Sequence, residues 1–215
     1  MEVVPFFLMI AMDSANNALT ERERCCISIA ALFALHRRTD AYHVLRVILG
    51  RYSFPTVFLE ELFVHLSLVL GFPAMLEGLE FVRTIRPADT RRVRKRPSGG
   101  GKKILGRIYG AQTTKLLQNI SRIHPDARSM IVNDVYGRVF ARPGLSLKER
   151  ELINVTVLAL QGLDRQLYSH LRGSLRLGFH VATMREALVL VQRVSKRKMR
   201  TARSLLRVVV SQRKK

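Results

Sequence analysis

The apolar residues of this chain follow helical spacing nearly throughout, and the strict alternation that is typical of β-strands is scarce. Three segments match the S/T-x-x-E capping box that begins many helices: residues 20–23 (TERE), 146–149 (SLKE) and 183–186 (TMRE). Each box is followed by an apolar run with a period of three to four residues. The sequence therefore predicts an all-α fold with three helix starts already marked.

The same periodicity, interrupted by glycine and proline, predicts the remaining helices. They lie near residues 40–49, 56–70, 74–83, 104–121, 126–140, 147–161, 164–177, 184–194 and 197–210. Residues 71–73 (GFP) separate the second of these from the third. Residues 86–103 contain two prolines and the run Ser-Gly-Gly-Gly, which predicts a flexible linker.

Positive charge is concentrated in two segments. The chain has a net charge of +21, of which residues 83–107 contribute +9 and residues 193–215 contribute +10. The rest is therefore nearly neutral, and the excess belongs to a basic linker and a basic C-terminal helix and tail. Such segments favour contact with polyanions through phosphate groups. The candidate contacts are Arg91, Arg92, Arg94, Lys95, Arg96, Lys196, Arg197 and Lys198.

The chain also resembles itself at a shift of 126 residues. Under this shift Thr20, Glu23 and Arg24 correspond to Ser146, Glu149 and Arg150, in the same order. Tyr42 corresponds to Tyr168, and a slip of one residue brings His43 onto His170. Shared amphipathicity explains apolar matches but not this ordered series of polar ones. We therefore interpret the chain as two tandem helical repeats.

Two segments of the second half resemble a known family. Residues 135–152 (VYGRVFARPGLSLKEREL) and 167–178 (LYSHLRGSLRLG) are similar to the carboxymuconolactone decarboxylase family, which includes the alkylhydroperoxidase D proteins. In the first half, residues 60–62 (EEL) and 70–74 (LGFPA) look like a later helix of that family. The implied organisation is a degenerate family-like repeat at 1–85, the linker at 86–103, a second repeat at 104–194 and the basic helix and tail at 195–215.

The resemblance implies an alkylhydroperoxidase D-like helical fold that commonly forms homo-oligomers, with a reactive glutamate on one helix and a histidine on the next. In this chain these are Glu151 and His170. The peroxidase branch of the family also has a C-x-x-C motif, whose places by spacing are Leu163 and Gln166. Since neither residue can form a thiolate, thiol peroxidase activity is disfavoured. The decarboxylase branch does not use that cysteine pair.

A helical hairpin could bring Glu151 and His170 together. In an antiparallel pair their heights along the helices would differ by about 6 Å, which crossing helices and long side chains can span. A contact across subunits of an oligomer is the alternative. A carboxylate beside the imidazole would make it a general acid able to protonate carbon as carbon dioxide leaves. The expected enclosed pocket would contain this pair and Arg172.

Three further residues are candidates for substrate binding in that pocket. Arg172 could hold a small carboxylate by a two-pronged hydrogen bond, and Tyr168 and Tyr136 could line the walls.

The two repeats differ at these positions. The residue of the first repeat that corresponds to Glu151 is Cys25, so the first repeat is expected to be degenerate. The second repeat in turn has Ser-Lys-Arg-Lys where the first has Leu-Gly-Phe-Pro. The two halves are thus expected to pack as a pseudo-dimer with one working pocket or none.

Two functions from different classes follow. One is a cofactor-free lyase acting on a small lactone or keto acid. The other is a noncatalytic helical scaffold that binds nucleic acid or an acidic partner through its basic segments. The sequence shows no phosphate-binding loop, nucleotide fingerprint or metal-ligand cluster, so neither function is expected to use a cofactor or a metal.

The location of the protein is predicted from its cysteines and its apolar runs. Cys25 and Cys26 are adjacent and form no disulfide framework, which favours a reducing, cytoplasmic compartment. The apolar run at residues 3–12 is shorter than the ~20 residues of a membrane-spanning helix, so no transmembrane segment is expected. This run either packs against the body or precedes a true start at Met12.

Overall fold

The computed structural model describes residues 18–86 and 100–213, which are helical and contain no strand. The all-α prediction is therefore confirmed for this part of the chain. The first half forms α2 (Glu21–Ala34), α3 (Arg38–Arg51) and α4 (Thr56–Ile85). The second half forms α5 (Gly101–Tyr109), η1 (Gly110–Gln112), α6 (Thr113–Ile123), α7 (Pro125–Met130), the π-helical η2 (Ile131–Phe140), α8 (Leu147–Gln161), α9 (Asp164–Arg176), α10 (Val181–Ser195) and α11 (Arg200–Arg213). The candidate contacts at residues 91–96 and the apolar run at 3–12 lie outside the described residues.

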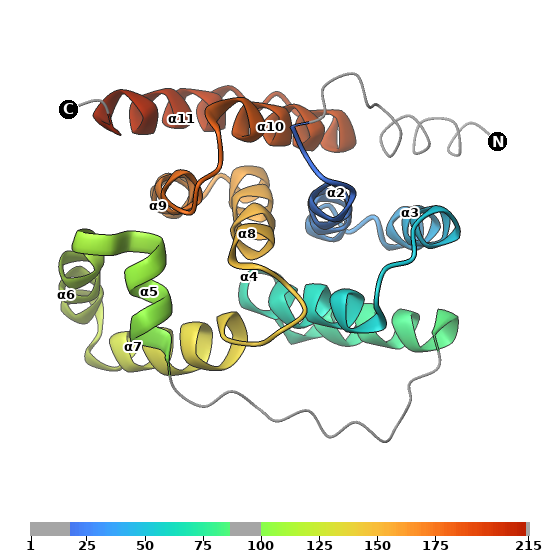
Figure 1. The fold of residues 1–215 in the computed structure, drawn as a ribbon, viewed down its shortest axis with the longest axis horizontal. Helices are drawn as coiled ribbons and strands as arrows, with labels where there is room; N and C mark the ends of the chain where they lie inside the picture. Colours follow the sequence, from blue (N-terminus) through green and yellow to red (C-terminus); the bar gives the residue numbers. More distant parts are fainter. Residues whose placement is uncertain (1–17, 87–99, 214–215) are drawn as a thin grey trace.

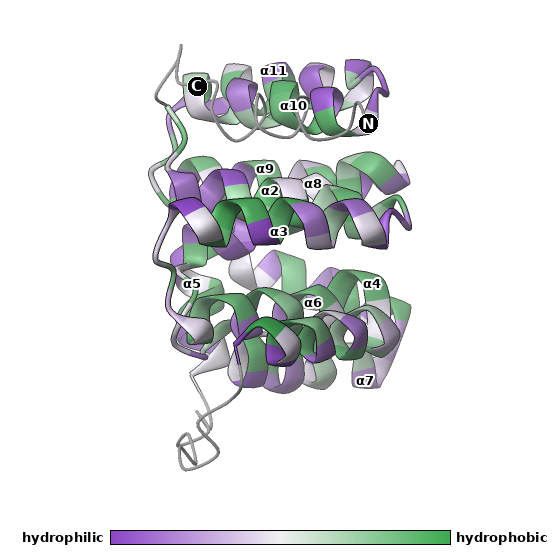
Figure 2. Ribbon diagram, turned by 90° about the vertical axis from the view of Figure 1, so that its right-hand side faces the viewer, coloured by the Kyte–Doolittle hydropathy of each residue, from purple (hydrophilic) through white to green (hydrophobic). Residues whose placement is uncertain are grey.

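The helices are stacked in three layers (Figures 1 and 2). The middle layer contains α3, α2, α8 and α9. Helices α10 and α11 cover one side of it, and α4 to α7 cover the other. The central helices α2 and α8 make the most extensive contact between any two elements, and α2 also packs on α10 while α8 packs on α4. Each half therefore covers the central helix of the other.

One hydrophobic core runs through both halves. It includes fully buried side chains of α2, such as Ile27 and Phe33, together with Ile153 and Val157 of α8. A smaller cluster lies between α5, α6 and η2 and is built around Leu105 and Tyr136. The apolar faces that the sequence places at helical spacing are the faces that meet in these two clusters.

Two of the three predicted capping boxes are confirmed. Thr20 and Ser146 each accept a hydrogen bond from the third residue of α2 and α8, and the glutamate at that position bonds back to the cap. The third box is wrong, because α10 begins at Val181. Glu186 instead accepts hydrogen bonds from the Ala18 amide and from the Arg24 guanidinium. A charged partner on another helix is a stronger donor than a neighbouring amide.

The predicted break at residues 71–73 is confirmed. Gly71 has φ +81° within α4, a conformation that glycine adopts without strain, and Pro73 follows it in the next turn. Of the described helices, α4 alone has the length and composition of a membrane span. Core helices of soluble proteins pass the same test, and the break at Gly71 divides α4 into two parts, each shorter than a bilayer requires.

The region before the family-like motif differs most from expectation. The predicted helix at 104–121 begins earlier, at Gly101, and is interrupted at Gly110, where the chain turns through η1 into α6. The guanidinium of Arg176 from α9 occupies the space beside Gly110 and fixes this turn against the next layer. The last three residues of the predicted linker, Gly101 to Lys103, therefore belong to a helix.

Candidate active site

Glu151 and His170 meet between α8 and α9. The Nδ1 atom of His170 lies 2.9 Å from Oε2 of Glu151, within the same chain. Glu151 is completely buried, whereas 17% of the His170 side chain is exposed to solvent. Of the two arrangements that the sequence left open, the structure has the contact within one helical hairpin, which places a buried carboxylate behind a partly exposed imidazole.

The proton on His170 is assigned by its two neighbours. Nδ1 also lies 3.4 Å from the Nδ2 atom of Asn154, which is a donor, so Nδ1 cannot donate to Glu151 and accept from Asn154 at once. The shorter contact to a carboxylate is the stronger one, and it places the hydrogen on Nδ1. The opposite ring nitrogen, Nε2, has no hydrogen-bond partner among the described residues. This atom is free to exchange a proton with a ligand.

Two tyrosines complete the surroundings of Glu151. The hydroxyl groups of Tyr109 from α5 and Tyr136 from η2 lie 3.0 Å apart. Burial raises the pKa of both phenols, and the charge of Glu151 adds to the increase. Both therefore stay protonated, and because one hydroxyl accepts from the other, one O–H remains as a donor. The Oε1 atom of Glu151 is buried and receives no hydrogen bond from the described residues.

Gly173 allows α9 to approach these groups. A Cβ atom at this position would lie 2.6 Å from Cγ2 of Ile108 and 3.2 Å from Oε2 of Glu151. Only a residue without a side chain fits in this space, where α5, α8 and α9 come together. Glycine at position 173 therefore keeps the carboxylate within reach of the imidazole one turn earlier on the same helix.

Behind the pair lies a buried ion network that connects both halves. Glu61 of α4 accepts hydrogen bonds from Arg142 at 2.7–2.9 Å and from Arg150 of α8 at 3.3 Å. Glu61 and Arg150 are completely or almost completely buried. Burial lowers the pKa of Arg150, and the charge of Glu61 opposes that shift. Each charge thus supplies the partner that the other needs away from water.

His65 links this network to the candidate active site. Its Nδ1 atom lies 3.3 Å from Nη1 of Arg150, and its Nε2 atom lies 3.0 Å from Oδ1 of Asn154, the residue beside His170. Burial and the positive charge of Arg150 hold the pKa of His65 well below 6.5. The ring is therefore neutral, with Nε2–H donating to Asn154 and Nδ1 accepting from Arg150.

The structure does not bring Arg172 and Tyr168 to the Glu151–His170 pair. Both lie two residues from His170, so they point to a different side of α9. Arg172 is exposed with its guanidinium 5.8 Å from the centre of the Tyr168 ring, and Tyr168 donates a hydrogen bond to Gln212 of α11. Tyr136 is the only one of the three predicted binding residues near Glu151, and Tyr109 is its partner there.

The pocket expected around Glu151 and His170 stays a prediction. A pocket does occur in the described part of the chain, but it lies between α10 and α11, and Glu151, His170 and Arg172 do not line it. The predicted phosphate contacts Lys196, Arg197 and Lys198 are exposed at the turn between these two helices.

The two cysteines are unsuited to thiol chemistry. Cys25 and Cys26 are free and completely buried in α2, and burial raises the pKa of Cys25 to about 12. Leu163 and Gln166 stand at the turn into α9, where the peroxidase branch of the resembled family has its cysteine pair. Within residues 18–86 and 100–213, no three histidine, cysteine or acidic side chains are grouped to hold a metal ion.

Sequence reasoning missed Tyr109, His65, Asn154 and the Glu61–Arg150 pair. The sequence did contain a signal for the other four residues. Glu61 and His65 are four residues apart in one apolar helix, and Arg150 and Asn154 are four residues apart in another. Such spacing puts each pair on one helix face. Tyr109 offered no comparable signal, since it approaches Glu151 only through the packing of α5 on α9.

Comparison with known proteins agrees with the motif in the second half. Residues 131–209 match the model of the carboxymuconolactone decarboxylase family. The match extends from η2 to α11 and includes Tyr136, Glu151 and His170, whereas α2, α3, α4 and α5 lie outside it. No curated protein matches the chain.

Proposed function

We propose that this carboxymuconolactone decarboxylase-like chain is a cofactor-free lyase acting on a small lactone or keto acid. The observation that carries the proposal is the 2.9 Å contact between Glu151 and His170, with the carboxylate buried and the imidazole partly exposed. A buried carboxylate fixes the ring orientation and holds the hydrogen on Nδ1, so that Nε2 is the atom through which a general acid would pass its proton to the substrate. The family match over both residues supports the reaction class.

The proposed step is decarboxylation followed by protonation of carbon. The bond between the substrate carbon and its carboxylate breaks, carbon dioxide leaves, and the electron pair passes into the adjacent carbonyl system as an enolate. His170 then gives its Nε2 proton to that carbon and remains neutral, with Nδ1–H still donating to Glu151. Solvent restores the Nε2 proton through the exposed edge of the ring.

Tyr109 and Tyr136 take the binding role that the sequence assigned to Arg172. Their pKa values are raised, so one phenolic O–H remains available as a donor to an enolate or carboxylate oxygen. A neutral donor placed where negative charge develops stabilises the transition state without being consumed. Arg172 is exposed, so it is available to contact anions at the protein surface instead.

We further propose that the two halves arose as tandem copies and pack as a pseudo-dimer. Under the 126-residue shift, α2 and α3 begin where α8 and α9 begin. The ion pair Arg150–Glu61 links α8 to α4, and the pair Arg24–Glu186 links α2 to α10 in the reciprocal way. The reciprocal pairs support an origin by duplication, because chance packing would not reproduce them.

The same correspondence explains why only one half would be active. With no slip, Glu151 and His170 correspond to Cys25 and Val44, which are both buried in the main core. His43, which the one-residue slip had matched to His170, is exposed on α3. The first copy therefore has apolar side chains where the second has an acid and a base.

The test of the lyase proposal is a pair of single variants. Glu151→Gln and His170→Ala are expected to lower kcat for carbon dioxide release from a panel of carboxylated γ-lactones and β-keto acids by about 100-fold or more. In D₂O the wild-type product should carry one deuterium at the carbon that lost the carboxylate. Glu77→Gln and His43→Ala are matched controls, because both residues are exposed in the other half.

Either of two results would exclude the lyase. One is a wild-type protein that releases no carbon dioxide from any member of the panel. The other is release that continues unchanged in both active-site variants while circular dichroism shows them to be folded.

A second function, polyanion binding by a noncatalytic scaffold, is favoured by a separate observation. Lys196, Arg197 and Lys198 are all exposed at the turn between α10 and α11. Elution from heparin should shift to lower salt when these three residues are changed to glutamine, since each phosphate contact adds to the salt dependence. An unchanged elution position would remove this candidate.

A further inference from the structure

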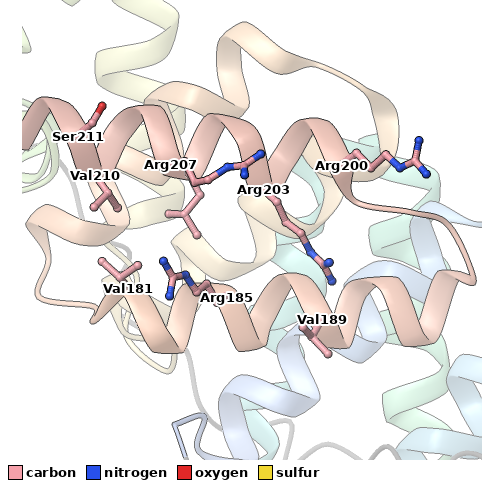
Figure 3. A pocket seen from close by; sticks show the side chains of 9 residues that line it. Val181, Arg185, Val189, Arg200, Arg203, Arg207, Val210 and Ser211 are labelled. Atoms are coloured by element: carbon pink, nitrogen blue, oxygen red, sulfur yellow. The ribbon is translucent and has the colours of Figure 1, made fainter.

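A groove of about 840 Å³ lies between α10 and α11, on the side of the molecule formed by these two helices (Figure 3). Its volume is in the range of pockets that hold small organic ligands. It shares no residue with the candidate active site. Its walls come from Val181, Arg185, Val189, Arg200, Arg203, Leu206, Arg207, Val210 and Ser211.

Four arginines surround this groove. Residues 200, 203 and 207 follow one stripe of α11, and Arg185 comes from the opposite helix. In Figure 3, Arg185 and Arg203 reach into the gap between the helices, Arg207 lies along its edge, and Arg200 stands at one end and points outward. Within the described residues, none of the four forms an ion pair. Like charges brought this close repel one another, and a bound anion would relieve the repulsion.

The rest of the lining is aliphatic. Val181 and Val210 face each other across one end of the groove, and Val189 lies further along α10 (Figure 3). Leu206 forms part of the buried core as well as part of the wall. There is no aromatic ring among the lining residues, so the groove offers no platform for stacking a nucleobase.

We propose that this groove binds a single-chain aliphatic phosphate monoester. The alkyl chain would lie against the valines and Leu206, where its burial is favourable. The phosphate would accept two-pronged hydrogen bonds from Arg203 and Arg207, with Arg185 across the gap. A dianionic phosphate fits a cluster of guanidinium groups that have no acidic partner among the described residues better than a monoanionic carboxylate does, and a flexible chain fits aliphatic walls better than a flat ring.

The bound species in this proposal is the free amphiphile and not a lipid within a bilayer. The arginines and the apolar residues line an open groove between two helices, so the chain of the ligand would lie along the wall that these helices form. A helix that sits on a membrane instead presents its apolar face outward. In α11 the buried residues are Ala202, Leu206 and Val209, whereas Arg200, Arg203 and Arg207 are exposed along the groove that α11 forms with α10.

The experiment is calorimetric titration of the full chain with decyl phosphate below its critical micelle concentration. We expect saturable binding of one molecule per chain, with no heat from inorganic phosphate or from decyltrimethylammonium at the same concentrations. The variant Arg203→Gln/Arg207→Gln should weaken binding by about tenfold or more, because it removes two charge-assisted contacts. The variant Arg122→Gln/Arg128→Gln removes the same charge from exposed sites on α6 and α7 and should bind as the wild type does.

Several results would overturn the proposal. Equal binding of inorganic phosphate would show an anion site without a chain-binding wall. Equal weakening in the two double variants would show that only net charge matters. A further arm replaces decyl phosphate with neutral-lipid vesicles containing phosphatidic acid, and another uses a single-stranded oligonucleotide. Binding confined to vesicles or to the oligonucleotide, with none to decyl phosphate, would assign the arginines to a membrane surface or to nucleic acid.

Discussion

Glu61 is a buried carboxylate that forms ion pairs with two arginines, Arg142 and Arg150. Removing it by Glu61→Ala would leave the fully buried Arg150 without an anionic partner, and we expect a loss of about 3–5 kcal/mol in the free energy of unfolding. Urea denaturation followed by circular dichroism measures this change. Glu77→Ala is the control, since its pair with Arg38 is half exposed and should contribute about 1 kcal/mol or less.

The lowered pKa of the buried His65 makes the free energy of unfolding depend on pH. The pKa of His65 in the folded protein lies well below the ordinary value of 6.5 that it has in the unfolded chain. Between these two pKa values, the unfolded chain binds a proton at His65 and the folded chain does not. Stability is therefore full above about pH 6.5 and falls as the pH is lowered, by up to about 1.4 kcal/mol per pH unit for this one group. The charges around the ring are Arg150 and, through Asn154, the Glu151–His170 pair.

The free energy of unfolding is measured for the wild type and for His65→Gln at pH values between about 7 and about 5. This range contains the ordinary histidine pKa of about 6.5. The variant should be less stable at neutral pH but should lose less stability as the pH falls. His43→Gln, at an exposed position of α3, should retain the wild-type slope. Identical slopes in all three proteins would show that His65 does not remain neutral in the fold.

At the scale of the helices, the crossing of α9 with α5 and α8 depends on Gly173. Gly173→Ala would place a Cβ atom 2.6 Å from Ile108 and 3.2 Å from Glu151, so the helices must separate. We expect a loss of about 1–3 kcal/mol in stability together with reduced lyase activity. Gly106→Ala in α5 is a matched control with open space around its Cβ, and it should be neutral or stabilising by up to about 1 kcal/mol. Equal effects of the two substitutions would contradict the close packing at Gly173.

The helices themselves were largely predictable from local signals. Apolar periodicity identified the core faces, and the caps at Thr20 and Ser146 fixed two helix starts, because a capping box depends only on neighbouring residues. The box at 183–186 failed because Glu186 has a charged partner, Arg24, that is distant in sequence. The break at Gly110 was missed for the same reason, since Arg176 of another helix fills the space beside it.

The candidate site was predictable where one hairpin determines it. Glu151 and His170 lie on consecutive helices, so the register of α8 against α9 decides their contact. Arg172 was assigned by its closeness in sequence to His170, but two residues along a helix turn the side chain to another face. Tyr109 and the Glu61–Arg150 pair depend on how separate helices pack, which periodicity does not specify.

For the whole molecule, the shared core predicts that the two halves unfold as one unit. α2 packs on α8 and α10, and α4 packs on α8, so the main core is built from both halves together. Ile27→Ala would remove a fully buried side chain of α2, at an expected cost of about 2–5 kcal/mol. Because opening is global, hydrogen exchange should accelerate in α8 and α10 as much as in α2. Accelerated exchange confined to α2, α3 and α4 would instead show two independent domains, and the interlocked pseudo-dimer would then be wrong.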